Sequence, residues 1–119
     1  MSKIDLEIEK ARQLLTAFEV FTGKNILKET FEIAVKITTD MTVGQEVSDL
    51  KFPVVSFCEN GSVDIFWKEK KFELLLNVCD GGEIEFFGEI FGGYTVRGRF
   101  RGEIPAGLKV FIREASAIS

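Results

Sequence analysis

The most regular feature of the sequence is a series of short apolar runs between residues 53 and 101, separated by segments that favour turns. The runs are PVVSFC, SVDIFW, FELLLNVC, EIEFFGEIF and YTVRGRFRG. The separating segments, rich in glycine or in charged residues, are residues 59–61, 68–71, 80–82 and 92–93. Such a pattern predicts strands joined by hairpins, and therefore an antiparallel β-meander of four to five strands. At Asn60-Gly61 we expect a two-residue turn, because both residue types accept a positive φ.

Apolar and charged side chains separate by parity within these runs, because successive side chains of a strand point to opposite faces of a sheet. One face collects the large apolar side chains, namely Val63, Ile65, Trp67, Phe72, Leu74, Leu76, Val78, Ile84, Phe86, Ile90, Val96 and Phe100. Such a layer must be covered by other elements of the chain. We therefore expect helices to pack on this face, and we expect substitution of Leu74 or Phe86 by Asp to unfold the protein.

Two segments near the ends of the chain have the spacing of amphipathic helices. The first places on one stripe Ile4, Ile8, Ala11, Leu15 and Phe18, with Leu14 and Phe21 widening the stripe. Gly23 is a natural end for this helix, because glycine tolerates the left-handed conformation of a helix C-cap. The second segment follows Pro105 and places on one helical face Leu108, Phe111, Ile112, Ala115 and Ile118.

Residues 25–41 fit two different elements. The alternation of Phe31, Ile33, Val35 and Ile37 with small or polar residues is typical of a half-buried strand, and β-branched residues favour strands. One helical face would instead collect Leu27, Phe31, Ala34, Thr38 and Met41, after a cap at Asn25. The length of the segment favours the helix, and the strand is the alternative. Residues 42–52 are expected to form a connecting loop.

Together these patterns predict an α+β fold, in which an antiparallel β-meander sheet of four to five strands is packed on one face by N-terminal and C-terminal helices. Both prolines of the chain, Pro53 and Pro105, fall at predicted boundaries between elements. We expect a single domain over residues 1–119, because 119 residues is an ordinary length for one domain and no linker or internal repeat interrupts the chain.

The composition excludes several classes of site. The sequence contains no histidine and two cysteines, which excludes Ser-His and Cys-His catalytic pairs, histidine-ligated metals and four-cysteine zinc sites. It contains no apolar run long enough to span a bilayer, so we expect no membrane protein. Residues 1–10 carry acids where a signal peptide would need an apolar core. We therefore expect a cytoplasmic protein with reduced thiols.

Charge is distributed unevenly along the chain. Residues 97–119 contain five cationic residues and two glutamates, although the whole chain has a net charge of −4. An acidic protein has no general affinity for nucleic acid or for anionic membranes, because phosphate binding requires positive charge at the contact. The local basic strip could bind an acidic partner, but we expect its arginines to pair with glutamates of the same chain.

The charged face of the predicted sheet holds the candidate interaction patch. Its apolar centre and charged rim consist of Phe66, Leu75, Phe87, Glu73, Glu89, Arg97, Arg99 and Arg101. An apolar centre with a polar rim is typical of protein interfaces. The alternatives are that these apolar residues are ordinary surface residues, or that another part of the chain covers them.

The placement of the three arginines depends on the loop at residues 92–93. An odd number of loop residues places them beside the glutamates of the preceding strand, whereas an even number turns them into the core at a prohibitive cost. We therefore expect an odd loop with a glycine-permitted bulge. A three-residue turn at residues 80–82 likewise places Leu75 opposite Phe87.

Other candidate chemistry in the sequence is weaker. The RGRFRG run resembles a single-strand-binding surface, but Phe100 points away from the arginines and glutamates neutralise them, so we expect no nucleic-acid partner. The alternating glutamates of residues 83–89 are typical of a solvated strand face. Cys58 and Cys79 lack a histidine to activate them and are expected to be inert packing residues. We accordingly predict no catalytic residue, no metal ligand and no cofactor.

The stretch from Pro53 to Phe87 resembles a group of small uncharacterised prokaryotic proteins. The shared pattern is a proline, a short strand, an Asn-Gly or Asp-Gly turn and a strand that ends in tryptophan, and it reads here PVVSFCENGSVDIFW, then FELLLNV and IEFFG. The resemblance covers about a third of the chain, and Phe66 stands where the pattern has an acidic residue before Trp67. It implies helices before the meander and one after it, and it implies neither an activity nor a site.

The sequence therefore favours a non-catalytic protein–protein interaction or accessory module over an enzyme. Its expected partner is another protein or a second copy of itself, in a homodimer that uses the charged face. The alternative is a small-ligand-binding or weakly catalytic protein with a pocket between the helices and the sheet. A deep polar pocket would favour the alternative, and a flat face with Phe66 and Phe87 exposed would favour the interaction module.

Overall fold

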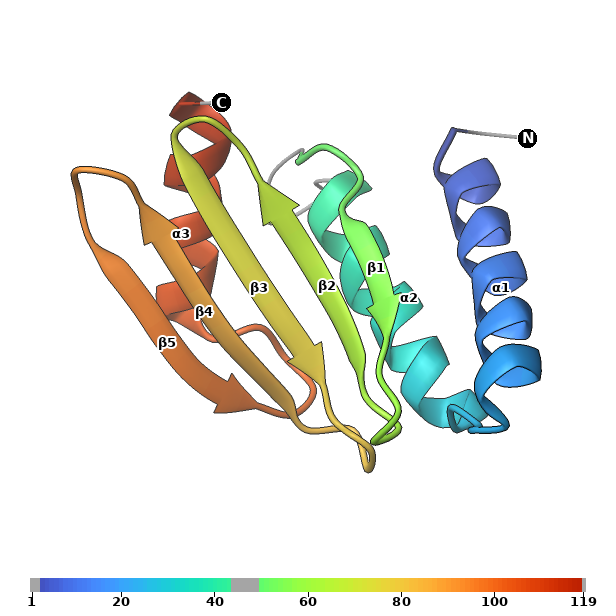
Figure 1. Cartoon of the computed structure of the whole chain (residues 1–119). Coiled ribbons are helices and arrows are strands. Elements are labelled where there is room, and N and C mark those ends of the chain that lie inside the picture. The colour runs from blue at the N-terminus through green and yellow to red at the C-terminus, as the bar shows by residue number, and fades with distance from the viewer. Residues whose placement is uncertain (1–2, 44–49, 119) are drawn as a thin grey trace.

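The five strands form one antiparallel sheet, in which each strand pairs with its neighbours in the sequence. The computed structural model describes residues 3–43 and 50–118, so part of the predicted loop at residues 42–52 lies outside the described residues. The elements are α1 (Lys3–Thr22), α2 (Lys28–Val43), β1 (Val54–Phe57), β2 (Val63–Lys68), β3 (Phe72–Val78), β4 (Ile84–Ile90), β5 (Thr95–Phe100) and α3 (Ala106–Ile118) (Figure 1). The sheet order β1-β2-β3-β4-β5 confirms the predicted meander and, with its flanking helices, the α+β fold.

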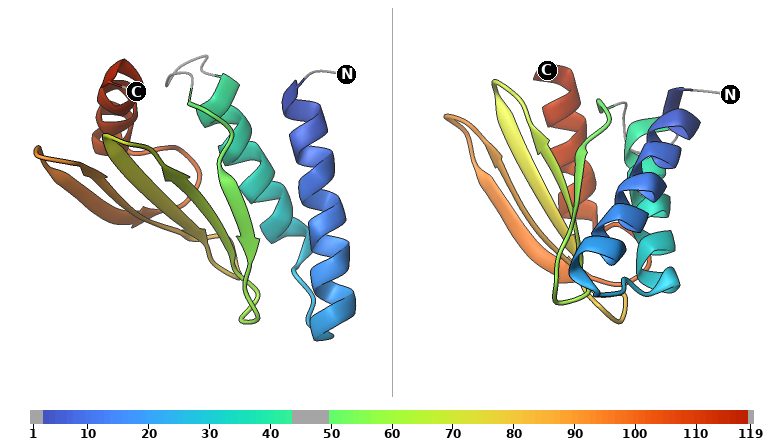
Figure 2. Two further views of the ribbon diagram at one scale, coloured as in Figure 1. Left: turned by 45° about the horizontal axis from the view of Figure 1, so that its top comes forward. Right: turned by 45° about the vertical axis from the view of Figure 1, so that its right-hand side comes forward.

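All three helices lie on one side of the sheet (Figures 1 and 2). α2 packs against β2 and β3, α3 lies behind the β3–β5 half, and α1 stands beside α2 at the β1 edge. No helix of residues 3–43 and 50–118 covers the other side, which we call the open face. Its outward-pointing strand residues are Val54, Ser56, Asp64, Phe66, Lys68, Glu73, Leu75, Asn77, Glu85, Phe87, Glu89, Thr95, Arg97 and Arg99.

The core lies between the sheet and the helices, and the parity of the strands determines which side chains enter it. The side chains of the inner face without exposed surface are Val63, Ile65, Leu74, Leu76 and Val78. From the helices, Met41, Leu108, Phe111, Ile112 and Ala115 are equally inaccessible. Each large apolar side chain removed from water in this way stabilises the fold by about 1.5–3 kcal/mol. The predicted division of odd and even positions between the two faces is confirmed.

The helical cover becomes thinner toward β5. Val96 and Phe100, which point inward from β5, are half-buried, whereas their counterparts in β2 and β3 are inaccessible. The hydroxyl of Tyr94 donates a hydrogen bond to Glu114 of α3 at 2.6 Å, and its ring meets Phe111 edge-on. Partial burial and the Glu114 carboxylate raise the pKa of Tyr94 to about 12, so the phenol stays a protonated donor at neutral pH.

Residues 28–43 form the helix α2, as the length of the segment favoured, and the alternative strand is wrong. The helix begins after the predicted cap at Asn25, and Leu27, which was expected on its buried face, precedes it and is 53% exposed. In α2 the buried apolar residues are Phe31, Ala34, Ile37 and Met41, which follow one another at intervals of three or four. Ile33 and Val35, which a strand would place beside Phe31, are half-buried at the margins of this stripe. The helix is favoured over the strand because it places these residues on one side, where they pack against the sheet.

The lengths of the hairpin loops agree with the register of the sheet. Three loops have three residues each, and they are closed by backbone bonds from Cys58 to Ser62, from Cys79 to Glu83 and from Ile90 to Tyr94. The odd loop predicted at residues 92–93 is therefore confirmed as residues 91–93, with Gly92 at φ 77°. The two-residue turn predicted at Asn60-Gly61 is wrong. The loop there has three residues, because Glu59 belongs to it as well. In this loop only Gly61 has a positive φ, of 92°, and Asn60 keeps a negative φ.

The prediction for α1 needs one correction. Its core-facing stripe is confirmed for Ala11, which is buried, and for Leu15 and Phe18, which pack half-buried against the core. Leu14 and Phe21 do not belong to this stripe, since they are 56% and 89% exposed. At 3.6 residues per turn, both positions rotate too far from Ala11 to reach the body of the protein.

A pair of neighbouring substitutions tests the parity of the sheet. Leu74 is inaccessible and Leu75 is 37% exposed, although the two residues are adjacent in β3. We expect Leu74→Asp to lower the free energy of unfolding by about 5 kcal/mol or to abolish folding, because it buries an unpaired carboxylate. Leu75→Asp should leave a folded protein. Circular dichroism and urea denaturation measure both effects, and equal losses in the two variants would contradict the assignment of faces.

Candidate functional site

An apolar row crosses the open face from β1 to β4. Val54, Phe66, Leu75 and Phe87 are direct cross-strand partners in succession, and Arg97 of β5 continues the row. Val54 is 66% exposed and Leu75 is 37% exposed, and the two phenylalanines are half-buried. The predicted patch of Phe66, Leu75 and Phe87 is therefore assembled as a continuous strip, and Val54 adds a residue that the sequence did not indicate.

Arg97 closes this row at its β5 end. Its guanidinium carbon lies over the ring of Phe87, 5.4 Å from the ring centre, which is the geometry of a cation–π contact. No carboxylate among the described residues lies within ion-pair distance of Arg97. An open hollow of about 530 Å³ lies beside it, lined by Leu75, Asn77, Glu85, Phe86, Phe87, Arg97, Gly98 and Arg99. The guanidinium is thus held by a ring and still has hydrogen-bond donors to offer.

Two glutamates of the predicted rim are cross-strand partners, and no described cation lies within ion-pair distance of either. Glu73 and Glu89 are direct partners across β3 and β4, and each has one further neighbour in its row, Lys68 and Thr95 respectively. Neither carboxylate forms an ion pair with a described cation. Like charges placed opposite one another in a sheet are destabilising. This position on the open face therefore favours the approach of a cation.

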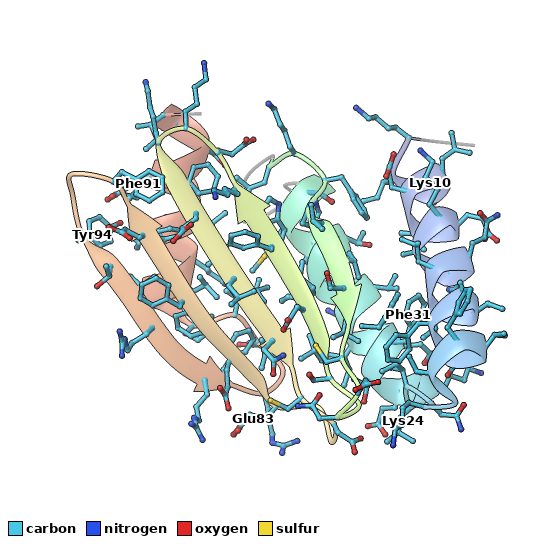
Figure 3. All side chains as sticks on the ribbon, viewed as in Figure 1. Lys10, Lys24, Phe31, Glu83, Phe91 and Tyr94 are labelled. Carbon is cyan, nitrogen blue, oxygen red and sulfur yellow. The ribbon has the colours of Figure 1, made fainter. Side chains whose placement is uncertain are left out.

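The arginines at the other end of β5 are satisfied within the chain. Arg99 lies 3.6 Å from Glu83 and 3.7 Å from Glu85, and Figure 3 shows Glu83 at the start of β4. Arg101 donates a hydrogen bond to the backbone carbonyl of Gly81 at 2.6 Å. The expected pairing with the chain's own glutamates is confirmed for Arg99 and not for Arg101, which binds a carbonyl, or for Arg97.

A hydrogen-bonded network occupies the end of the open face near the turns. Asn77 donates to Asp64 on the neighbouring strand and to the hydroxyl of Ser62 at 3.1 Å. The thiol of Cys58 donates to Asp64 at 3.4 Å, and the thiol of Cys79 donates to the side-chain oxygen of Asn77 at 3.2 Å. Both cysteines are free and half-buried on this face, where their thiols take part in the hydrogen-bonded network.

The electrostatics of this network suppress thiol reactivity. Burial and then the charge of Asp64 raise the pKa of Cys58, although a hydrogen bond from Ser62 opposes the shift. Burial, followed by the charges of Glu85 and Glu83, raises the pKa of Cys79. A raised pKa keeps a thiol protonated at neutral pH, and the thiolate is the nucleophile. The arrangement does not favour covalent catalysis.

The cavity described between the helices and the sheet is small. A narrow cavity of about 10 Å³ lies among α1, α2 and β1, lined by Ile8, Ala11, Phe31, Ala34, Val35, Thr38, Phe52 and Val55. This volume is close to the lower limit for one water molecule, and its lining is almost entirely apolar. The cavity is not the deep polar pocket that would have favoured a ligand-binding protein.

No helix in residues 3–43 or 50–118 combines the length and the apolar character needed to cross a membrane. The same residues contain no group of three histidine, cysteine, aspartate or glutamate side chains placed to hold a metal ion. Comparisons with protein-family models, with curated proteins and with solved structures found no match. The resemblance of residues 53–87 to small prokaryotic proteins therefore stays a prediction.

The charge of Asp64 on Cys58 provides a test of the network. In a Cys79→Ser background, Asp64→Asn should lower the pKa of Cys58, because it removes a facing negative charge while the burial of the thiol persists. The pH dependence of alkylation by iodoacetamide, followed by mass spectrometry, measures this pKa. The control is Asp64→Asn in a Cys58→Ser background, where the pKa of Cys79 should stay unchanged. An unchanged Cys58 profile would show that Asp64 does not act on the thiol.

Proposed function

We propose that the protein is a non-catalytic module that binds another protein through its open face. The observation that carries this proposal is the apolar row of Val54, Phe66, Leu75 and Phe87, which crosses four strands without a covering helix. In a two-layer fold, an apolar strip on the solvent side contributes nothing to the core. Contiguous apolar surface with a charged rim is typical of a surface that a partner covers.

The charges around the row indicate the chemistry of the partner surface. Glu73 and Glu89 have no described cation within ion-pair distance and favour a cationic group, whereas Arg97 retains donors for an acidic or carbonyl group. Glu89 of β4 and Arg97 of β5 lie on neighbouring strands, and both are close to Phe87. The matching partner surface is therefore apolar at its centre and carries a basic and an acidic residue close together.

A cytoplasmic setting fits this proposal. The two thiols are free, and their raised pKa values slow the oxidation that begins from a thiolate. The alternative function, a small-ligand protein with a pocket between helices and sheet, has too little room at the cavity among α1, α2 and β1. The hollow of about 530 Å³ on the open face has the volume of a ligand site, but it is open and belongs to the same surface as the apolar row.

Substitution of the two phenylalanines tests the open face. We expect Phe66→Ser combined with Phe87→Ser to weaken partner binding by about tenfold or more, because aromatic residues at the centre of an interface dominate its affinity. A photo-crosslinking residue at Leu75 should capture the partner, which is then purified and titrated against each variant. Val110 of α3, which is 46% exposed behind the sheet, provides the matched control as Val110→Ser and as a crosslinking position.

The fold of the double variant is checked by circular dichroism, since both phenylalanines are half-buried. A folded double variant that binds the purified partner as tightly as the wild-type protein would overturn the proposal. Crosslinking from Val110 that equals crosslinking from Leu75 would also count against it.

A further inference from the structure

The side of α1 that faces away from the protein carries the most exposed large apolar side chains of the described structure. Phe21 is 89% exposed and Val20 is 76% exposed, and Leu14 and Leu6 on the same side are 56% and 49% exposed. We call this surface the outer stripe, and its residues are Leu6, Lys10, Leu14, Ala17, Val20 and Phe21. In Figures 1 and 2, α1 is the outermost element at the β1 edge, so no described segment lies beyond it.

The opposite side of α1 is also apolar. Ala11 is buried there, and Phe18 meets Phe57 of β1 with ring centres 6.0 Å apart. The guanidinium of Arg12 lies 5.2 Å from the ring centre of Phe31, which Figure 3 shows between α1 and the sheet. A helix that is apolar on two sides is typical of an element between two apolar surfaces. The core of the same chain is one of these apolar surfaces, and it packs against the inner side of α1.

Four of the six residues of the outer stripe lie at symmetrical positions about its middle, whereas Val20 would face Glu7 of the other copy. Leu6 and Phe21 lie equally far from a point between Gln13 and Leu14, and so do Lys10 and Ala17. Two antiparallel copies of α1 related by a two-fold axis at this point would place Leu6 of each copy against Phe21 of the other. The small side chain of Ala17 leaves room for the long aliphatic stem of Lys10. The stripe therefore fits a second copy of itself.

We propose that two copies of the protein associate through the outer stripes of α1, antiparallel and with the two-fold axis near Leu14. The contact is isologous, because the same residues of both copies form it. It is separate from the open face and does not depend on the partner proposed there. Since a single pair of helices of 20 residues buries less than a standard protein interface, the dimer is expected to dissociate in the micromolar range.

The charges around the stripe favour a second copy over a membrane surface. Lys10 is paired with Glu7 at 3.3 Å, so its charge is partly offset within the helix. The whole chain has a net charge of −4, which opposes binding to anionic lipid. An amphipathic helix that lies on a membrane usually has a strongly basic polar face, whereas α1 carries Asp5, Glu7, Glu9 and Glu19.

Single cysteines placed along α1 test the antiparallel geometry. In a Cys58→Ser, Cys79→Ser background, Gln13→Cys lies next to the proposed axis and should form a disulfide-linked dimer under mild oxidation. Leu6→Cys alone should not, because its symmetry mate lies about 22 Å away along the helix at 1.5 Å per residue. A mixture of Leu6→Cys and Phe21→Cys should yield the mixed dimer, which mass spectrometry separates from either homodimer.

Sedimentation across the micromolar range measures the association itself. Leu14→Glu with Phe21→Glu should give a folded monomer, and Thr16→Glu, an exposed substitution beside the stripe, should dimerise as the wild-type protein does. A wild-type protein that is monomeric throughout this range would overturn the proposal, and so would Leu6→Cys homodimers forming as readily as Gln13→Cys homodimers. Phe66→Ser with Phe87→Ser should dimerise normally, which separates a failure of this proposal from a failure of the open face.

Discussion

The agreement between loop length and side-chain parity is the constraint on which the rest of the structure depends. Across each three-residue loop, after β1, β3 and β4, the residues that point to the open face stay even-numbered or stay odd-numbered in both strands. The hairpin between β2 and β3 pairs Lys68 with Glu73, and there the outward positions change from even to odd, as they do in the sequence. A slip of one residue in β5 would exchange Val96 for Arg97 at the core. The cost of burying a guanidinium makes this register exclusive.

The position of the helices determines which surfaces remain available for other molecules. α2 and α3 cover the inner face of the sheet from β2 toward β5, and α1 stands outside this layer with Ala11 as its one buried residue. No described helix therefore covers the open face of the sheet, and no described segment lies against the outer stripe of α1. The protein presents two apolar surfaces of different shape, one nearly flat sheet face and one helical ridge.

Much of the fold could be predicted from the sequence because the strands carry a strict two-residue period. The same period predicted Phe66, Leu75 and Phe87 on the open face, together with their glutamates and arginines. Val54 was missed for a physical reason: a two-residue turn at Asn60-Gly61 would pair Val55 with Phe66, whereas the three-residue loop pairs Val54 with it. The preference of Asn-Gly for tight turns is local, and the register is decided by burial along the whole hairpin.

The helices were harder to predict, because apolar residues in them satisfy more than one pattern. The segment that became α2 contains both a two-residue and a helical period, and only contact with the sheet distinguishes them. In α1, Leu14 and Phe21 were predicted to widen the core stripe because they lie next to it on a helical wheel. The structure turns both side chains toward solvent. Their exposure shows a second apolar stripe, on the side of α1 that faces away from the sheet.

The outer stripe of α1 and the open face of the sheet lie on different sides of the protein, so both can be occupied at once. α1 stands at the β1 edge of the sheet, and the open face lies on the side of the sheet away from the helices (Figure 1). The residues of the outer stripe are exposed on α1. Antiparallel pairing through α1 would therefore leave the open face of each copy accessible. A dimer that presents two such faces binds a partner with repeated sites more tightly than a monomer, because the second contact forms at a high effective concentration. A modest affinity at each open face would then be sufficient for stable binding.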